Sequence, residues 1–424
     1  MFRTVLLVLC VLMSVTRLAW GFASWDDGTS SVEARGAADV SGIFSGYPQP
    51  RFLYPEQYEG LGDATFRLLF DARSGNWLRF ELNGYQELSG LSRNESLMNY
   101  SESYRTRYLK YDWIKHGNMS APIVADQVKF TFVANPIDIQ VGRQPINLAN
   151  NFLFTPNDLF HPFSPTAVDR AFRPGVDAVR VNVSISSLAR LSVIGVFGYN
   201  DKDSPDWEHS AAIFFGGFNA AKFDWQFLGG KAEGRYLAGS AFSGEVSRFG
   251  LRAEGNASLP TQGNKRIYGQ AAAGMDYKWD YHNFQLIAEY YFHGNGEIDP
   301  NRYLNSLYSQ YFLDDPYMGT HYVGASFRAD ATALLNVQAT VLANVADPSG
   351  IFSPGLTYNA ANDVEFILYS LVPLGRQPYM KDFFPPPPSG ALLRKIDNLP
   401  QFPALRSEYG TYPWSVMVQT RIYF

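Results

Sequence analysis

The stretch Val416-Met417-Val418-Gln419-Thr420-Arg421-Ile422-Tyr423-Phe424, at the end of the 424-residue chain, decides the fold. Successive side chains of a β-strand point to opposite faces. One face of this stretch therefore carries Val416, Val418, Thr420, Ile422 and Phe424, and the other carries Gln419, Arg421 and Tyr423. The pattern predicts a strand with one apolar face and one polar, charged face.

The same alternation recurs along the chain, at the length expected of tilted membrane strands. Three apolar sets are Phe66, Leu68 and Phe70; Val128, Phe130 and Phe132; and Leu286, Ala288, Tyr290 and Phe292. A soluble sandwich also alternates, so a single such strand decides little. Here about 18 candidate strands lie between Asp63 and Phe424 without yielding to helices. They predict an all-β fold, a transmembrane antiparallel β-barrel of about 16–18 strands.

Composition favours the same fold class. Aromatic residues make up 16% of the chain, yet the mean hydropathy is slightly negative. A membrane barrel combines these properties because each of its strands has one polar face. The net charge of −5 is weak, and no basic-aromatic module suggests a nucleic-acid partner.

The N-terminus has the layout of a secretory signal peptide over residues 1–23. Arg3 precedes an apolar run from Val5 to Val15, and small residues precede a cut at Ser24. A membrane anchor is the alternative, but this run is shorter than the roughly 20 residues that a bilayer demands. The single cysteine, Cys10, falls inside the predicted peptide, so the mature chain would have no disulfide, thiolate metal site or Cys-attached haem. Residues 24–61 are expected to be an N-terminal periplasmic or lumen segment, and 62–424 the barrel.

The closing strand and its terminal Phe424 resemble the last strand of bacterial outer-membrane β-barrel porins. This resemblance implies location in the outer membrane, contact with outer-membrane lipids, and recognition of Phe424 as an assembly signal by the barrel-assembly machinery. Gly142–Val181 is also similar to the inward-folded loop of porins. It resembles the matching region of the alginate-export-like porin family, where a Gly-Arg-Gln strand end is followed by a loop and a charged strand start.

Residues 143–175 are therefore the predicted constriction loop. Thr155-Pro156-Asn157-Asp158 reads as a turn or helix start with Asp158 placed to cap. Asp169, Arg170 and Arg173 would set the pore field if the loop folds inward, and would be solvated if it faces outward. Arg143 and Asp177 end and begin the flanking strands, so antiparallel pairing predicts an ion pair at the loop base.

A basic strip is the second candidate feature. Its predicted pore-lining and selectivity residues, assigned to neighbouring strands, are Arg67, Arg79, Arg105, Arg107, Lys129 and Arg180. Ladders of Arg or Lys favour anions in a pore. The alternative is that these cations fill a polar lumen in networks with acidic partners.

Loop lengths test the topology, because barrels of this kind have short periplasmic turns and longer external loops. Long connections at 143–175, 200–209, 294–318 and 375–410 fit that phase. The tight turn at Arg73–Asn76 and the long connection at Gly90–Tyr100 break it. Either a strand near the N-terminus is miscounted, with a further strand within Ala38–Phe44, or one periplasmic turn is long.

The predicted function is an outer-membrane channel for small hydrophilic solutes, with an anionic solute or an acidic polysaccharide as finer alternatives. A second hypothesis is a barrel sheath that encloses a partner multihaem cytochrome. No enzyme activity, metal or cofactor is expected, because the six His residues show no HExxH motif and no paired metal spacing.

Overall fold

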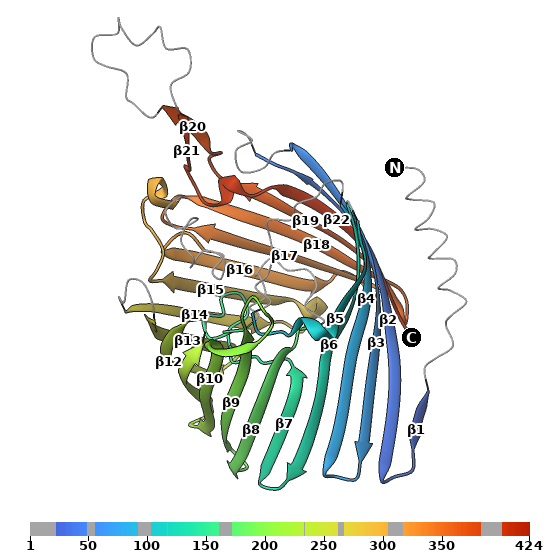
Figure 1. Ribbon diagram of the computed structural model, residues 1–424. Coiled ribbons are helices and arrows are strands. Elements are labelled where there is room, and N and C mark those ends of the chain that lie inside the picture. Colours follow the sequence, from blue (N-terminus) through green and yellow to red (C-terminus); the bar gives the residue numbers. More distant parts are fainter. Residues whose placement is uncertain are drawn as a thin grey trace, which may run out of the picture.

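The computed structural model describes residues 23–48, 56–91, 103–116, 118–160, 172–232, 234–261, 267–303, 317–382 and 401–424. Residues 1–22 of the predicted signal peptide lie outside these ranges. The described part of the chain is almost entirely strand and turn (Figure 1). No helix in it is long and apolar enough to cross a membrane.

Within the described residues, the main sheet has 20 strands, of which 18 form a closed antiparallel barrel. The wall strands are β2 (Ser30–Gly46), β3 (Tyr58–Ser74), β4 (Leu78–Leu91), β6 (Met119–Ala134), β7 (Ile137–Gln144), β8 (Val176–Ser186), β9 (Ala189–Tyr199), β10 (Pro205–Ala220), β11 (Phe223–Ala232), β12 (Arg235–Val246), β13 (Phe249–Pro260), β14 (Tyr268–Lys278), β15 (Gln285–His293), β16 (His321–Asp330), β17 (Leu335–Asn344), β18 (Ser349–Ala361), β19 (Val364–Leu374) and β22 (Trp414–Tyr423). The hairpin of β20 (Tyr379–Asp382) and β21 (Gln401–Ala404) projects beyond the rim (Figure 1).

The barrel closes between its first and last wall strands. Ala37 of β2 is opposite Tyr423 of β22, and the pairing continues to Gly46 opposite Trp414. The terminal Phe424 extends it, exchanging two backbone hydrogen bonds with Gly36 at 2.7 and 3.0 Å. Closure matters because an unpaired strand edge in lipid leaves N–H and C=O groups without partners, at several kcal/mol each.

This closure corrects one prediction. Residues 24–61 were expected to lie outside the wall, but β2 supplies its first strand and pairs along its length with β3 and β22. The segment is rich in Ala, Gly and Ser, so its alternation carries little hydropathy contrast.

The apolar side chains of the strands face outward, as the alternation predicts. Phe66, Phe130 and Phe366 are 43%, 44% and 45% exposed on the outer surface, whereas Arg67 is 9% exposed. A soluble fold would bury the aromatic rings and expose the arginine. The outer surface is therefore suited to lipid, and the opposite, inner face of each strand is called the lumen face below.

The strand order also resolves the conflict in loop phase. Because neighbouring wall strands run in opposite directions, the turn 75–77 lies at the same end as the C-terminus, with 135–136, 187–188 and 221–222. The strand ends that flank the long connections lie at the other end, namely Leu91 and Met119, Gln144 and Val176, His293 and His321, and Leu374 and Trp414. Counting β2 as a wall strand restores the expected alternation of short and long connections.

A short strand beside β6 does not change this count. β5 (Lys110–His116) pairs with β6 at 119–124, while β7 pairs with β6 only at 128–134. Thus β5 takes the place beside β6 that β7 leaves when the chain turns inward after Gln144. β5 fills this gap in the barrel wall and does not add a separate membrane-spanning strand.

Candidate functional site

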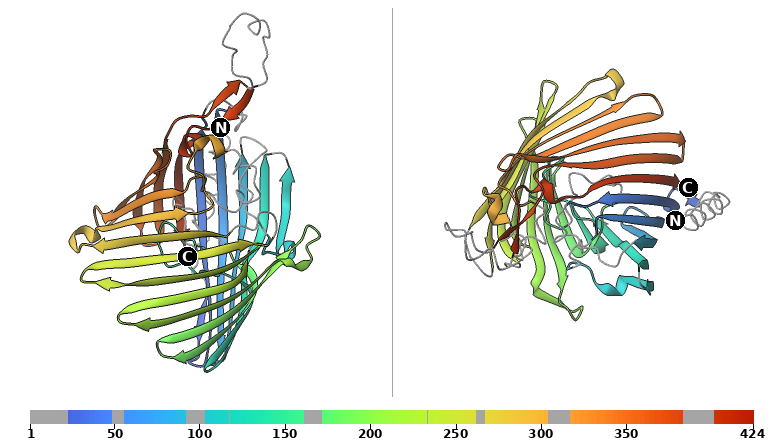
Figure 2. Two further views of the ribbon diagram at one scale, coloured as in Figure 1. Left: turned by 90° about the vertical axis from the view of Figure 1, so that its left-hand side faces the viewer. Right: turned by 90° about the horizontal axis from the view of Figure 1, so that it is seen from above.

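The segment 145–160 leaves the wall after β7 and lies inside the ring of strands (Figure 2). Asn256 of β13 donates from Nδ2 to Pro156 O at 2.8 Å, and Asn157 Nδ2 donates to Ser240 O of β12 at 3.2 Å. These partners are 100 and 83 residues away in the sequence. Of the two positions that the sequence left open for this loop, the structure has the inward one.

Two glutamates on the lumen faces of β13 and β15 hold the segment by its backbone. Glu289 accepts N–H groups from Phe152 at 2.8 Å, Leu153 at 3.0 Å and Phe154 at 2.9 Å. Glu254 accepts the N–H groups of Asn150, Asn151 and Asn157, the last two at 3.1 and 3.2 Å. Both glutamates are buried. Carboxylates serve here because backbone N–H groups of an irregular segment need acceptors, and hydrogen bonds to a charged acceptor are stronger than neutral ones.

Apolar packing fixes the same segment against one side of the lumen. Phe154 is fully buried and stacks on Tyr291 of β15, with ring centroids 5.2 Å apart. Earlier in the segment, Ile146 and Leu148 belong to a buried cluster with residues of β8–β12, including Ile194. Part of the lumen is therefore a packed core.

Two arginine–aromatic contacts join the ends of the described loop to different strands. Arg252 of β13 lies over the Phe152 ring at 4.1 Å. Arg67 of β3 lies over the Phe172 ring at 4.2 Å, and its Nη1 is 3.1 Å from Asp126. Because such contacts strengthen when water is excluded, they anchor both arms of the loop to the inner surface.

An ion pair closes the loop on itself. Arg173 Nη1 lies 2.6 Å from Asp158 Oδ2. Burial raises the pKa of Asp158 to about 6, although the charge of Arg173 acts to lower it. The expected turn forms, with the Asp158 N–H donating to Thr155 O at 2.9 Å, but the Asp158 side chain binds Arg173 and does not act as a cap. Asp169 and Arg170 lie outside the described residues.

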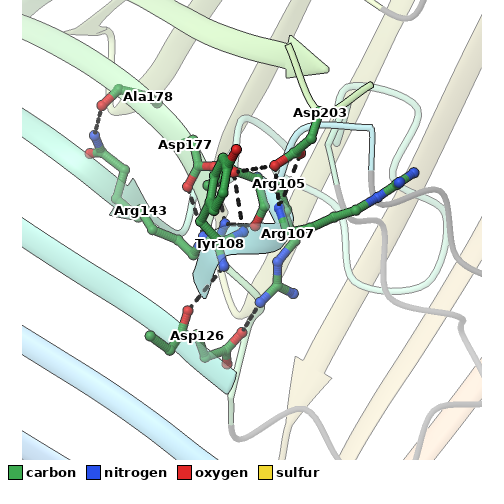
Figure 3. A network of polar contacts seen from close by, with 11 residues as sticks. Arg105, Arg107, Tyr108, Asp126, Arg143, Asp177, Ala178 and Asp203 are labelled. Atoms are coloured by element: carbon green, nitrogen blue, oxygen red, sulfur yellow. Dashed lines mark hydrogen bonds and ion pairs between the residues drawn. The ribbon is translucent and has the colours of Figure 1, made fainter. Parts of the chain in front are cut away.

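The base of the loop contains the Arg143–Asp177 ion pair (Figure 3). Arg143 Nε and Nη2 lie 2.7 and 3.0 Å from the two Asp177 oxygens, and Arg143 is 2% exposed. The segment before β5 covers the pair, because Thr106 donates its N–H to Asp177 at 2.7 Å and accepts from Arg143 Nη2 at 2.8 Å. The ion pair thus joins β7, β8 and the segment that leads into β5, at the point where the chain turns inward.

Most of the predicted basic strip is paired with acids. Arg67 and Arg105 share Asp126, and Arg79 Nε lies 2.7 Å from Asp71. Lys129 Nζ lies 2.6 Å from Glu81. Arg180 donates to the neutral Asn182 Oδ1 at 2.8 Å. The side chains occur on the lumen side in the networks that the sequence offered as the alternative to a free basic ladder.

The sequence predicted all residues of the basic strip to lie on strands, but two of them do not. Arg105 lies in the turn before η1 (Arg107–Leu109), a short 3₁₀ helix that begins at Arg107. The Arg107 side chain is exposed, with Nη1 3.4 Å from Asp201 O. Figure 3 shows both residues beside Asp203, whose carboxylate accepts the Arg107 N–H at 3.1 Å. This stretch was predicted to be a strand, but hydrogen bonds from Thr106 and Arg107 to the distant Asp203 stabilise a turn.

The residues that hold the inward segment were not singled out as its partners. Neither Glu254 nor Glu289 was among the predicted site residues. The usable signal is that Glu254 is the one acid in Phe249–Pro260, a strand of otherwise small and apolar residues apart from Arg252. An isolated lumen-facing carboxylate needs donors, and an inward loop supplies them.

A second buried polar cluster joins the connections at the end of the barrel opposite the C-terminus. Glu408 is 0% exposed and accepts from Tyr322 Oη at 2.5 Å and Asn344 Nδ2 at 2.7 Å. Its own N–H donates to Asp347 at 2.6 Å. Burial raises the pKa of Glu408 to about 7, and the hydrogen bond from Tyr322 acts to lower it. The cluster links η5 (Tyr409–Thr411) to β16 and to the β17–β18 connection.

A closed 18-stranded barrel with an apolar outer surface and a chain segment bound inside its lumen has the fold of bacterial porins. Solved structures agree with this class. OpdL of Pseudomonas aeruginosa matches with a TM-score of 0.55 and 11% identity, over 93% of this chain and 98% of that one. OccAB1 of Acinetobacter baumannii matches with a TM-score of 0.53 and 10% identity, over 96% and 98%. OccAB4 of the same species matches with a TM-score of 0.52 and 8% identity, over 93% and 98%.

At these identities the likeness concerns the fold. No protein-family model matches the chain, and no curated protein matches it. The alginate-export-like resemblance stated from the sequence is therefore not confirmed.

Proposed function

We propose that the protein is a passive channel of the bacterial outer membrane for small hydrophilic solutes, narrowed by the segment 143–175. The observation that carries the proposal is the binding of residues 150–157 to Glu254 and Glu289 inside the lumen. A segment held by buried charge-assisted bonds reduces the width of the passage permanently. Location in the outer membrane, export by residues 1–23 and the role of Phe424 in assembly belong to the same proposal.

The passage would run along the lumen faces of β22, β2 and β3. The inner side chains of β2 and β3 are polar and partly exposed, with Asp63 accepting hydrogen bonds from Ser41 and from Thr65, whereas Arg421 and Asp39 form a buried ion pair at 2.6 Å behind them. Because this polar wall lies opposite the apolar packed segment, hydrated solutes would keep their hydration shell as they pass. Selectivity would come from width and fixed charge, with no energy coupling.

Anion preference is the finer proposal, and it rests on the basic strip. Since Arg67, Arg79, Arg105 and Lys129 each lie beside a carboxylate, their net field is weaker than the sequence predicted. The solute class is accordingly kept at small and hydrophilic. An acidic polysaccharide gains no support from these contacts.

A sheath around a multihaem cytochrome would need an unobstructed lumen. The inward segment and its apolar clusters occupy space that such a partner would need. No observation favours this second hypothesis, and it is not proposed.

Planar-bilayer recordings test the channel. Purified barrel should give ohmic conductance steps, and replacing residues 148–173 by a short Gly-Ser linker should enlarge them severalfold. A deletion of β20 and β21, which lie outside the lumen, is the matched control and should leave the step size unchanged. A wild-type barrel that inserts but never conducts would refute the channel, and equal steps with and without the segment would refute the constriction.

A further inference from the structure

An apolar groove crosses the outer surface of β13–β15, close to the short turns. Its volume is about 420 Å³, within the range of ligand-binding clefts. Residues that form it include Arg248, Phe249, Met275, Trp279, Leu286 and Ala288. The groove is on the lipid-facing side, so it plays no part in the passage.

The groove exists because small side chains interrupt an otherwise bulky apolar surface. Ala288 is opposite Met275 on one neighbouring strand and opposite Ala325 on the other. This hollow at Ala288 is called the dent below. Towards the short β14–β15 turn the surface is closed by aromatic rings, and the ring centroids of Tyr277 and Trp279 are 4.2 Å apart. Trp and Tyr concentrate where hydrocarbon meets the headgroup layer, so the dent lies at the depth of an acyl chain.

Two opposite charges stand at the polar end of the groove. Arg248, in the turn between β12 and β13, is exposed and hydrogen-bonds the Tyr277 hydroxyl. Asp280 is near enough to interact with it electrostatically, and the Asp280 side chain makes no capping hydrogen bond in its own turn. Arg248 has five N–H groups, so donors remain after the bond to Tyr277.

We propose that this groove binds one zwitterionic phospholipid of the leaflet that faces the periplasm. The lipid phosphate accepts hydrogen bonds from Arg248, its ammonium group lies beside Asp280, and one acyl chain fills the dent at Ala288. Asp280 disfavours a purely anionic headgroup, whereas an ammonium group complements it. The inference rests on the membrane location in the proposed function, but not on channel activity.

Native mass spectrometry tests it on the full-length barrel in detergent with phosphatidylethanolamine or phosphatidylglycerol as the probe. Wild-type barrel should retain one phosphatidylethanolamine in preference to phosphatidylglycerol. Arg248→Gln removes the phosphate donor and Ala288→Trp fills the dent, so each should weaken retention at least fivefold. Asp280→Asn should reduce the preference for phosphatidylethanolamine over phosphatidylglycerol.

Lys222→Gln is the matched control, because Lys222 is also an exposed cation in a short turn at the same end of the barrel. Its retention of lipid should equal that of the wild type. Equal loss in Arg248→Gln and Lys222→Gln, or no loss in Ala288→Trp, would overturn the site, as would a wild-type preference for phosphatidylglycerol. Conductance recorded on the same samples separates the two proposals: a conducting barrel without selective retention refutes only the lipid site, and a non-conducting barrel refutes only the channel.

Discussion

The substitution Glu289→Gln tests how the inward segment is held. The Glu289 carboxylate accepts the N–H of Phe152 on one oxygen, and the N–H groups of Leu153 and Phe154 on the other. A glutamine is nearly isosteric, so packing around it is preserved. It offers one oxygen, however, and turns an NH₂ group toward at least one backbone donor.

The cost follows from these three bonds. A hydrogen bond to a charged group contributes about 1.5–3 kcal/mol and a neutral one about 0.5–1.5 kcal/mol. Weakening two bonds by about 1 kcal/mol each and losing a third gives about 3.5–5 kcal/mol. Water that enters the site recovers part of this, so we expect about 3 kcal/mol, which is roughly a 100-fold increase in the population of the released segment.

Hydrogen exchange measures that population directly. The amides of residues 152–154 should exchange about 100-fold faster in Glu289→Gln than in the wild type, and single-channel traces should show added openings of larger size. Glu365→Gln is the matched control, because Glu365 is a carboxylate on the lumen face of β19, away from the segment. If residues 152–154 exchange equally fast in both variants, the carboxylate does not hold the segment.

Three further predictions follow from other charged groups. Arg143→Met should lower stability by about 3–5 kcal/mol because it leaves Asp177 buried and unpaired, and adding Asp177→Leu should restore part of the loss; urea titration followed by gel mobility measures both. For Glu408, a pKa raised from 4.5 to about 7 means that the packed state keeps a proton that the opened state releases. Packing of η5 should therefore be strongest below pH 4.5 and weaken as the pH rises through 7; the protection factors of the η5 amides, corrected for intrinsic exchange, should fall more than about tenfold from pH 5 to pH 8 and stay constant in Glu408→Gln. The double substitution Arg105→Glu and Arg107→Glu should reduce the anion selectivity of the channel, mostly through Arg105, and should therefore shift the reversal potential measured in planar bilayers. An unchanged reversal potential would show that the basic strip does not set selectivity.

Alternation in sequence predicts the wall well because membrane strands must place apolar groups outward. Phe66, Phe130 and Phe366 follow this rule, and so does the closing strand through Phe424. The rule fails where the two faces of a strand differ little in hydropathy. The outer face of β2 has only Val32, Val40 and Phe44 as large apolar residues among Ala and Gly, so its pattern is faint, although the register with β22 shows it to be a wall strand.

Charged residues in the site were harder to predict for a different reason. Arg143 and Asp177 could be paired from the sequence because they flank one loop on adjacent strands. Glu254 and Glu289 contact residues 97–137 positions away, and no local pattern encodes such a distance. Arg105 and Arg107 alternate like strand residues, but the position of Arg105 follows from Asp126 and that of Arg107 from Asp203, which belong to other elements.

The choice of acceptor inside the lumen has a simple physical basis. In a closed barrel every wall strand uses its backbone N–H and C=O groups to pair with its neighbours, so a chain segment that turns inward finds few backbone partners on the wall. Only side chains remain, and N–H groups require acceptors that carry oxygen. A carboxylate provides two oxygens and accepts three of these groups at Glu289, which a hydroxyl or an amide at the same position cannot match. A barrel that narrows itself with its own chain therefore needs acids on the lumen face opposite the loop, and Glu254 and Glu289 occupy those positions.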